Sequence, residues 1–143
     1  MRRIDNIVIH CSAGHGDLES VRRWWREGLG WKQVGYHFWV DYDGSITQLV
    51  PLSVVTNGVR NHNYNSVHIA YRGGVKRGTT IPEDTRTEKQ IAAILTAIFQ
   101  VLKELKPIQD VTNIRILGHR DFPNVAKACP SFDALREYEW ITV

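Results

Sequence analysis

The segment Lys127-Ala128-Cys129-Pro130-Ser131-Phe132-Asp133 carries the most informative residues of this chain. It places a cation, a thiol and the start of a helix together, shortly after His119. A thiolate and an imidazole are good zinc ligands, and Lys127 could reach a polarised substrate oxygen. A single Cys is, however, more often a small buried hydrophobe, and no CxxC or HxxxH pattern supplies a third ligand nearby. Residues elsewhere in the chain must therefore decide whether Cys129 is a metal ligand.

The composition is that of an ordinary globular protein. With 143 residues, 43% hydrophobic and 23% charged, the chain has the length of one domain, and we expect residues 1–143 to form it. No apolar run approaches the ~20 residues that a membrane-spanning helix needs. The net charge of +3 attracts polyanions mildly, but scattered Lys and Arg favour neither nucleic acid nor an acidic cell wall.

The first residues show no export signal. Arg2 and Arg3 precede no apolar segment with a cleavage site, so we expect no signal peptide. Without one, the two cysteines, Cys11 and Cys129, are expected to stay reduced. They are then interpreted as metal-binding or catalytic residues rather than as a disulfide.

Residues 4–11 are predicted to form a buried strand, because Ile7, Val8 and Ile9 are a β-branched apolar run. Successive side chains on a strand point to opposite faces. If His10 faces a site, Cys11 therefore faces away from it, and we expect Cys11 to be a packing residue.

A helix is predicted from Asp17, its N-cap, to Gly28 or Gly30. Its apolar residues have the spacing of a core-facing stripe: Leu18, Val21, Trp24 and Trp25.

Residues 35–41 show the side-chain alternation of a strand and are rich in aromatic residues, and Asp43-Gly44 follows them. An Asp-Gly pair between two strand-like runs is a strong hairpin signal, so residues 45–50 should return antiparallel.

The second half predicts a strand, a long helix, another strand and a short helix. Residues 56–66 have the composition of a surface loop, and residues 67–72 that of a strand. Thr87 and Gln90 form a capping box for a helix that Pro107 stops. Its predicted apolar face is Ile91, Ile94, Leu95, Ile98, Leu102 and Leu105. A strand at 114–117 follows, and Ser131 is predicted to cap a last helix that extends through Asp133, Leu135 and Trp140. This order indicates a single-domain α/β fold, with helices on a mixed central β-sheet.

His10 is the candidate third ligand. It ends the first strand, His119 follows the last strand, and Cys129 lies in the loop beyond. Binding groups in α/β sheets gather at strand ends, so the three residues could converge despite their separation in sequence. The remaining histidines are weaker candidates. His37 is predicted to face away from its neighbour Tyr36, and His15, His62 and His68 are expected to line a groove or the surface.

The sequence resembles a known family, the zinc-dependent N-acetylmuramoyl-L-alanine amidases of the amidase type 2 group, which includes phage lysozyme-type amidases and peptidoglycan recognition proteins. Four stretches carry the resemblance in the family's order and span nearly the whole chain: Ile9-His10-Cys11-Ser12-Ala13; Gly35-Tyr36-His37-Phe38 with Asp43-Gly44; Asn65-Ser66 before a strand that ends in Gly73-Gly74; and Lys127 to Asp133.

The resemblance implies a Zn2+ ion held by His10, His119 and Cys129, with the fourth position open. It gives catalytic roles to Tyr36 and Lys127. Elementary chemistry agrees, because zinc makes attack on an amide possible at neutral pH and a Lys can stabilise the resulting oxyanion. Tyr36 could position water or pass a proton to the leaving amine. Packing of Tyr36 within the strand and solvation of Lys127 remain the alternatives.

Two departures from the family pattern concern the substrate groove. Many members carry Trp-His-Ala-Gly where this chain has Thr56-Asn57-Gly58-Val59, so a histidine that helps to bind substrate is missing. His68 stands where a Gly is usual, and we expect its side chain to intrude where backbone would meet the substrate.

The resemblance implies a hydrolase that cleaves the amide between N-acetylmuramic acid and L-alanine in bacterial peptidoglycan. A phage or prophage endolysin fits best: a monomer without a membrane or nucleic-acid partner, cytoplasmic until released to the cell wall. The alternative is a non-catalytic peptidoglycan-binding module on the same fold. Since binding-only members commonly replace the ligating Cys, the presence of Cys129 favours the enzyme. A third possibility is regulation of an intracellular protein partner, for which no residue here specifies a surface. The preferred stem-peptide chemistry is left open.

Overall fold

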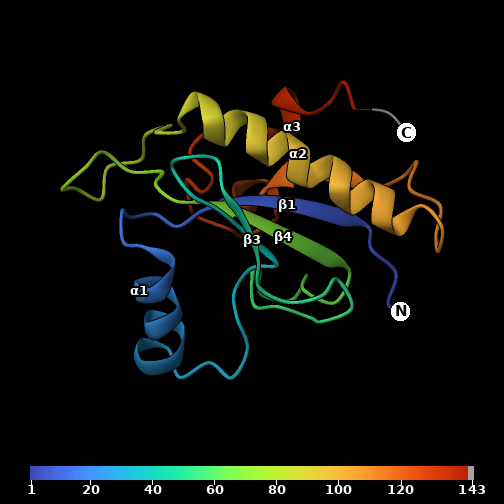
Figure 1. Cartoon of the computed structure of the whole chain (residues 1–143), viewed down its shortest axis with the longest axis horizontal. Coiled ribbons are helices and arrows are strands. Elements are labelled where there is room, and N and C mark those ends of the chain that lie inside the picture. The colour runs from blue at the N-terminus through green and yellow to red at the C-terminus, as the bar shows by residue number, and fades with distance from the viewer. Residues whose placement is uncertain (142–143) are drawn as a thin grey trace.

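One mixed β-sheet with strand order β3-β2-β4-β1-β5 forms the centre of the computed structural model, which describes residues 1–141 (Figure 1). The predicted α/β sheet is thus confirmed. Its strands are β1 (Asn6–Cys11), β2 (Phe38–Val40), β3 (Ile46–Gln48), β4 (Ser66–Tyr71) and β5 (Arg115–Gly118). The helices are α1 (Leu18–Arg23), which continues into a π-helical turn (Trp24–Gly28), α2 (Glu88–Leu105), a 3-10 turn (His119–Asp121) and α3 (Ala134–Glu137). Among residues 1–141, none of these helices has the length and apolarity to cross a membrane.

The strand directions bring distant residues to one edge of the sheet. β1 lies between β4 and β5 and is parallel to both, while β2 is parallel to β4. The carboxyl ends of these strands therefore share an edge, and chain segments that leave it can meet there. The predicted hairpin is confirmed, since β2 and β3 pair antiparallel; Tyr36 and His37 lie before β2 rather than on it.

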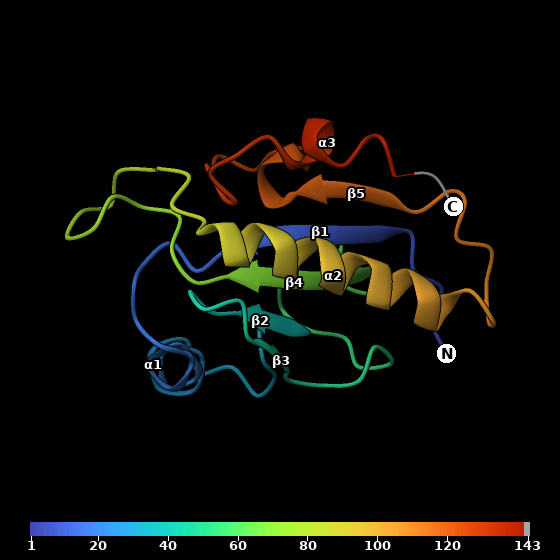
Figure 2. The same ribbon diagram turned by 45° about the horizontal axis from the view of Figure 1, so that its top comes forward.

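Side-chain alternation divides the sheet into two faces. α2 crosses one face, over β1 and β4 (Figure 2), and the main core lies beneath it. On that face β1 contributes Ile7, Ile9 and Cys11, so the prediction that Cys11 is a packing residue is confirmed. Val8 of β1 packs on the other face, in a small cluster with Val59, Leu117 and Phe122. His10, two residues after Val8, shares this second face.

α2 begins and packs largely as predicted. The Thr87 hydroxyl accepts a hydrogen bond from the Gln90 backbone N–H at 3.0 Å, and the Gln90 side chain accepts from the Thr87 N–H at 2.9 Å. The buried face is formed by Gln90, Ala93, Ile94, Ala97, Ile98, Val101, Leu102 and Leu105. The prediction for Ile91 is wrong, because its side chain is 42% exposed. Buried Gln90 and Ala93 show that the face is rotated away from Ile91 in the first turn.

α1 does not pack as a core helix, contrary to the prediction. Asp17 caps it as expected, but α1 buries no residue, and it stands beside the sheet (Figure 1). Trp25 is buried, whereas Trp24 is 57% exposed. Consecutive helical side chains point about 100° apart, so the two indoles cannot share one buried direction. The widened turn also ends the regular helical spacing at Trp24.

The last helix is capped differently from the prediction. Asp133, not Ser131, accepts the capping bond, from the Arg136 N–H at 3.2 Å. Ser131 has φ of 67°, outside the extended conformation of an N-cap, and its hydroxyl donates to the Gly74 carbonyl at 2.7 Å. α3 ends at Glu137, so Trp140 lies beyond it and is exposed.

Candidate metal centre

Three predicted ligands converge at the carboxyl edge of the sheet. His10 is near the end of β1, His119 begins the 3-10 turn directly after β5, and Cys129 lies in the loop before α3. One ligand atom from each residue lies within 4.8 Å of the other two. The parallel pairing of β1 with β5 explains this convergence, because both strands end at the same edge.

The spacing of these atoms fits a tetrahedral metal. The Nδ1 atom of His10 lies 3.8 Å from the Sγ atom of Cys129. Zn–N and Zn–S bonds of about 2.1 and 2.3 Å at a tetrahedral angle place nitrogen and sulfur about 3.6 Å apart. The rings of His10 and His119 meet edge to face, with centroids 4.9 Å apart. Two imidazoles and one thiol are a donor set that zinc prefers.

Hydrogen bonds from backbone N–H groups hold the Cys129 loop against β1 and the 3-10 turn. The Cys11 N–H donates to Cys129 Sγ at 3.2 Å, and the Arg120 N–H donates to the Cys129 carbonyl at 2.8 Å. An N–H group that points at sulfur stabilises the thiolate form. Asp121 fixes the start of the 3-10 turn by accepting the Gly118 N–H at 2.7 Å.

Burial keeps both imidazoles neutral, the form that binds metal. It lowers the pKa of His10 well below the ordinary 6.5, and the positive charge of Lys127 acts in the same direction. Burial and the charge of Lys127 lower the pKa of His119 to about 4. Burial raises the pKa of the Cys129 thiol in the metal-free protein, so a bound cation is what would draw off its proton.

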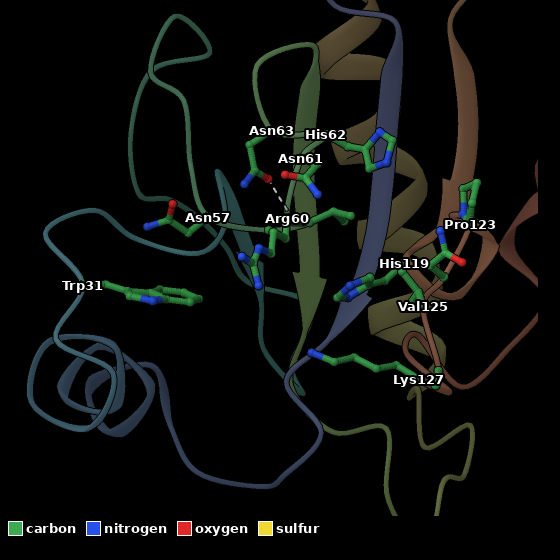
Figure 3. A pocket seen from close by; sticks show the side chains of 14 residues that line it. Trp31, Asn57, Arg60, Asn61, His62, Asn63, His119, Pro123, Val125 and Lys127 are labelled. Atoms are coloured by element: carbon green, nitrogen blue, oxygen red, sulfur yellow. Dashed lines mark hydrogen bonds between the residues drawn. The ribbon is translucent and has the colours of Figure 1, made fainter.

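A pocket opens above the three ligand residues. Its volume is about 560 Å3, and it also contains Tyr36, Lys127 and the indoles of Trp24, Trp25 and Trp31. An adjoining groove of about 760 Å3 continues from His119 and Lys127 along the loop of residues 57–63 (Figure 3). Side chains that Figure 3 shows around it include Trp31, Asn57, Arg60, Asn61, His62 and Asn63.

The Arg2 guanidinium anchors the chain that forms this groove wall. It donates to five carbonyl groups, those of Leu52, Val54, Asn63, Tyr64 and Ser66. Arg2 therefore joins both ends of the irregular segment between β3 and β4.

Tyr36 lies beside His10, with ring centroids 5.1 Å apart. Trp25 packs edge to face against the Tyr36 ring, with centroids 5.3 Å apart. The Tyr36 hydroxyl donates to the Cys11 carbonyl at 3.5 Å. Burial raises the pKa of Tyr36, and negative charge on the nearby Cys129 sulfur acts in the same direction. The phenol therefore stays protonated at neutral pH and can donate a hydrogen bond into the pocket.

Lys127 is exposed and comes from the loop that follows the 3-10 turn. In Figure 3 its side chain extends from this loop toward the end of β1, next to the His119 imidazole. Lys127 thus provides a mobile positive charge at the junction of the pocket and the groove.

His68 corrects the sequence prediction. It is fully buried within β4, so it neither lines the groove nor intrudes on a substrate. Its Nδ1 atom instead lies 2.8 Å from Nε2 of His10. The alternation Val67-His68-Ile69 explains this position, because Val67 and Ile69 face the α2 core and His68 must face the opposite side. The parity of this strand was the signal that could have located His68 from the sequence.

The other histidines lie away from the ligand cluster. His62 lines the groove, as predicted, and packs on Phe122 with centroids 4.7 Å apart. His15 contacts the Tyr42 hydroxyl and the Val75 carbonyl. His37 is buried on the far side of His68, with ring centroids 6.0 Å apart. Asn63, which the sequence did not predict as a site residue, is hydrogen-bonded through its side-chain oxygen to Nε2 of His68 at 3.0 Å.

A His-His-Cys cluster, a donor set that could hold a metal ion, lies under an open pocket at the carboxyl edge of the mixed sheet. The family model for N-acetylmuramoyl-L-alanine amidase (Amidase_2) matches residues 1–132. The chain belongs to this family, which confirms the predicted enzyme class: it is an N-acetylmuramoyl-L-alanine amidase, which hydrolyses an amide bond of peptidoglycan.

Individual relatives agree with this assignment. The endolysin of Klebsiella phage KP32 is 33% identical over 137 residues, which are 93% of this chain and 84% of that protein. Among solved structures, the endolysin of the Thermus scotoductus bacteriophage Ph2119 superposes with a TM-score of 0.72 at 24% identity, over 91% of this chain and 79% of that one. Apis mellifera PGRP-SA superposes with a TM-score of 0.75 at 19% identity, over 99% of this chain and 86% of that one. These two structures share the fold of this chain.

Proposed function

We propose that this amidase is zinc-dependent and cleaves the amide between the lactyl group of N-acetylmuramic acid and L-alanine, with His10, His119 and Cys129 as metal ligands. The convergence of these three ligand atoms within 4.8 Å is the observation that carries the proposal. Three protein ligands leave a fourth tetrahedral position, which a catalytic zinc site keeps for water or substrate.

A bound zinc ion would polarise the scissile carbonyl and lower the pKa of a water molecule bound to it toward about 7. The remaining steps belong to residues of the pocket. Lys127 donates hydrogen bonds to the carbonyl oxygen as negative charge develops on it. Its position beside His119, at the mouth of the pocket, supports this role.

Tyr36 is proposed to hold the attacking water and to pass a proton to the leaving amine. Tyr36 lines the pocket, and its ring is fixed between His10 and Trp25. A protonated phenol can donate to the leaving nitrogen and regain the proton that the attacking water loses, which avoids expulsion of an unprotonated amide anion.

The proposed setting is phage lysis. The relative from Klebsiella phage KP32 is an endolysin, and the present chain matches 84% of its length. We infer that this enzyme accumulates in the cytoplasm and reaches peptidoglycan after another protein permeabilises the membrane. Addition of purified protein to cells with intact and with permeabilised outer layers tests this inference, with lysis expected in the permeabilised cells alone.

Digestion of purified peptidoglycan tests the reaction. Zinc-loaded protein should release new L-alanine amino groups, a chelator should abolish this release, and added zinc should restore it. New amino groups on a different residue would assign the cleavage to another bond. Binding to the wall without any release would favour a recognition module instead.

The two cysteines supply a matched pair of variants. Cys129→Ser removes the proposed ligand and should abolish hydrolysis while binding to peptidoglycan persists. Cys11→Ser changes the other thiol, which packs in the core, and should retain zinc and most of the activity. An active Cys129→Ser protein would remove this thiol from the metal site.

A further inference from the structure

A buried contact between two imidazoles lies directly behind the metal cluster. His68 of β4 pairs in register with Val8 of β1, so it lies on the same sheet face as His10, one pleat behind it. The His68 Nδ1 atom and the His10 Nε2 atom are 2.8 Å apart, and both rings are buried. At this distance one nitrogen must donate a proton and the other must accept it.

Asn63 decides the direction of this hydrogen bond. Its side-chain oxygen accepts the Val59 backbone N–H at 2.7 Å. A backbone N–H can only donate, so the atom that faces it is the amide oxygen rather than the nitrogen. The same oxygen lies 3.0 Å from Nε2 of His68, and this contact requires a proton on that nitrogen.

The tautomers of both histidines follow. A neutral His68 with its proton on Nε2 has a free lone pair on Nδ1, so it must accept the His10 Nε2–H. His10 then has its lone pair on Nδ1, the atom that lies 3.8 Å from Cys129 Sγ. The nitrogen that faces the candidate metal is thus the one able to bind it.

The surrounding chain packs closely around His68 and holds its backbone. Its N–H donates to Nδ1 of His37 at 3.0 Å, and its carbonyl accepts the His37 N–H at 2.9 Å. Gly58 lies against the ring, and a Cβ atom at this position would overlap the imidazole. A glycine is therefore required where the groove loop passes over His68.

We propose that His68 is a positioning residue for the metal site: held by Asn63, it accepts the His10 Nε2–H and thereby fixes the tautomer and ring orientation with which His10 binds the metal. The inference rests on the proposed metal site. Groups that hold the second nitrogen of a ligating histidine typically change metal affinity about ten- to a hundredfold when they are removed.

Two amide variants separate this role from simple packing. In His68→Asn the side-chain oxygen can occupy the place of Nδ1 and accept the His10 Nε2–H. In His68→Gln the amide reaches the place of Nε2 and leaves His10 without an acceptor. We expect zinc affinity, measured by competition with a chromophoric chelator, to fall about ten- to a hundredfold in His68→Gln and to stay within a few-fold of the wild type in His68→Asn.

The Co2+-substituted proteins provide a second readout. The visible absorption spectrum of bound cobalt should be wild-type in His68→Asn and altered in His68→Gln. Equal losses of affinity in both variants would reduce His68 to a packing residue and overturn the proposal, as would wild-type affinity in both.

Nitrogen chemical shifts in the wild-type protein test the tautomers directly, even if the variants fail to fold. Long-range 1H–15N correlation spectra should show protonated Nε2 on both His10 and His68. A proton on Nδ1 of His68 would overturn the proposal. A wild-type protein that binds no zinc would instead reject the proposed function, while the same spectra of the metal-free protein would still report the tautomers.

Discussion

Individual residues at this site act through a particular atom, and His10 is the clearest case. Its Nδ1 atom points to Cys129 and its Nε2 atom to His68. Both nitrogens of the imidazole are therefore in use: Nδ1 faces the metal cluster, and Nε2 contacts the buried His68. Such a ring contributes to catalysis through its orientation, because a flipped ring would present a protonated nitrogen to the metal.

Tyr36→Phe should remove the hydroxyl and leave the ring in place. The ring contacts to His10 and Trp25 persist, so zinc affinity and thermal stability should stay close to wild type. Proton transfer by a positioned side chain contributes about 10²–10⁴ to rate, and we expect kcat to fall by roughly a hundredfold or more. Steady-state kinetics on soluble muropeptides measure this loss. Unchanged kcat would make Tyr36 a packing residue.

His37 should make stability depend on pH. Burial lowers its pKa to about 4 from the ordinary 6.5, and the charge of Arg2 acts in the same direction. The unfolded chain therefore takes up this proton near pH 6.5 and the folded chain only near pH 4. The contribution to stability is complete above pH 6.5 and is lost as the pH falls toward 4, by up to roughly 3 kcal/mol.

His37→Asn tests this dependence, because an amide oxygen can still accept the His68 N–H but does not titrate. Denaturant unfolding between pH 6.5 and 4.5 should give a shallower slope for the variant, by roughly 1 kcal/mol per pH unit. Both proteins are compared without metal, so that proton competition at the ligands does not enter. Parallel slopes would contradict the lowered pKa.

At the scale of elements, the sequence predicted what local chemistry determines. The Asp43-Gly44 hairpin and the Thr87 capping box depend on residues close in sequence, and both formed as expected. Parallel strand ends likewise brought His10 and the other two ligands together. The errors concern contacts that tertiary packing decides. The exposure of Trp24 depends on where α1 lies relative to the sheet. Strand parity places His68 on one sheet face, but its contact with His10 depends on the register between β1 and β4.

Removal of the Thr87 hydroxyl should destabilise the start of α2 and its link to the hairpin. The hydroxyl accepts the Gln90 N–H and also donates to the Tyr42 carbonyl at 2.7 Å. Loss of such an N-cap typically costs about 1 kcal/mol, and the second bond brings the expectation for Thr87→Ala to roughly 2 kcal/mol. Chemical denaturation measures the change. Thr87→Ser keeps the hydroxyl and should stay within about 0.5 kcal/mol of wild type, so an equal loss in both would assign the effect to the methyl group.

At the scale of the whole molecule, polar side chains anchor the C-terminal segment with the Cys129 loop and α3 to the rest of the fold. The Arg86 guanidinium lies over the Phe132 ring and pairs with both Asp84 and Glu137. This cluster fixes α3, while Tyr71 of β4 donates to the Pro130 carbonyl at 2.6 Å. The loop that carries Cys129 is thereby held from both sides, and a metal bound to Cys129 and His10 would join residues that are 119 positions apart in sequence.

Metal removal should therefore lower the stability of the folded chain. Zinc that binds the assembled ligands but not the unfolded chain stabilises the protein by about 2.7 kcal/mol at a free concentration of 100 times Kd. For a domain of this size we expect the chelator to lower Tm by roughly 10 °C, and readdition of zinc to reverse the change.

Scanning calorimetry of wild type and Cys129→Ser, each with and without zinc, measures this effect. The variant lacks the ligand that joins the end of the chain to β1, so its Tm should not respond to the metal. An equal zinc response in both proteins would place the stabilising ion elsewhere, and no response in the wild type would contradict a metal site built from the folded chain.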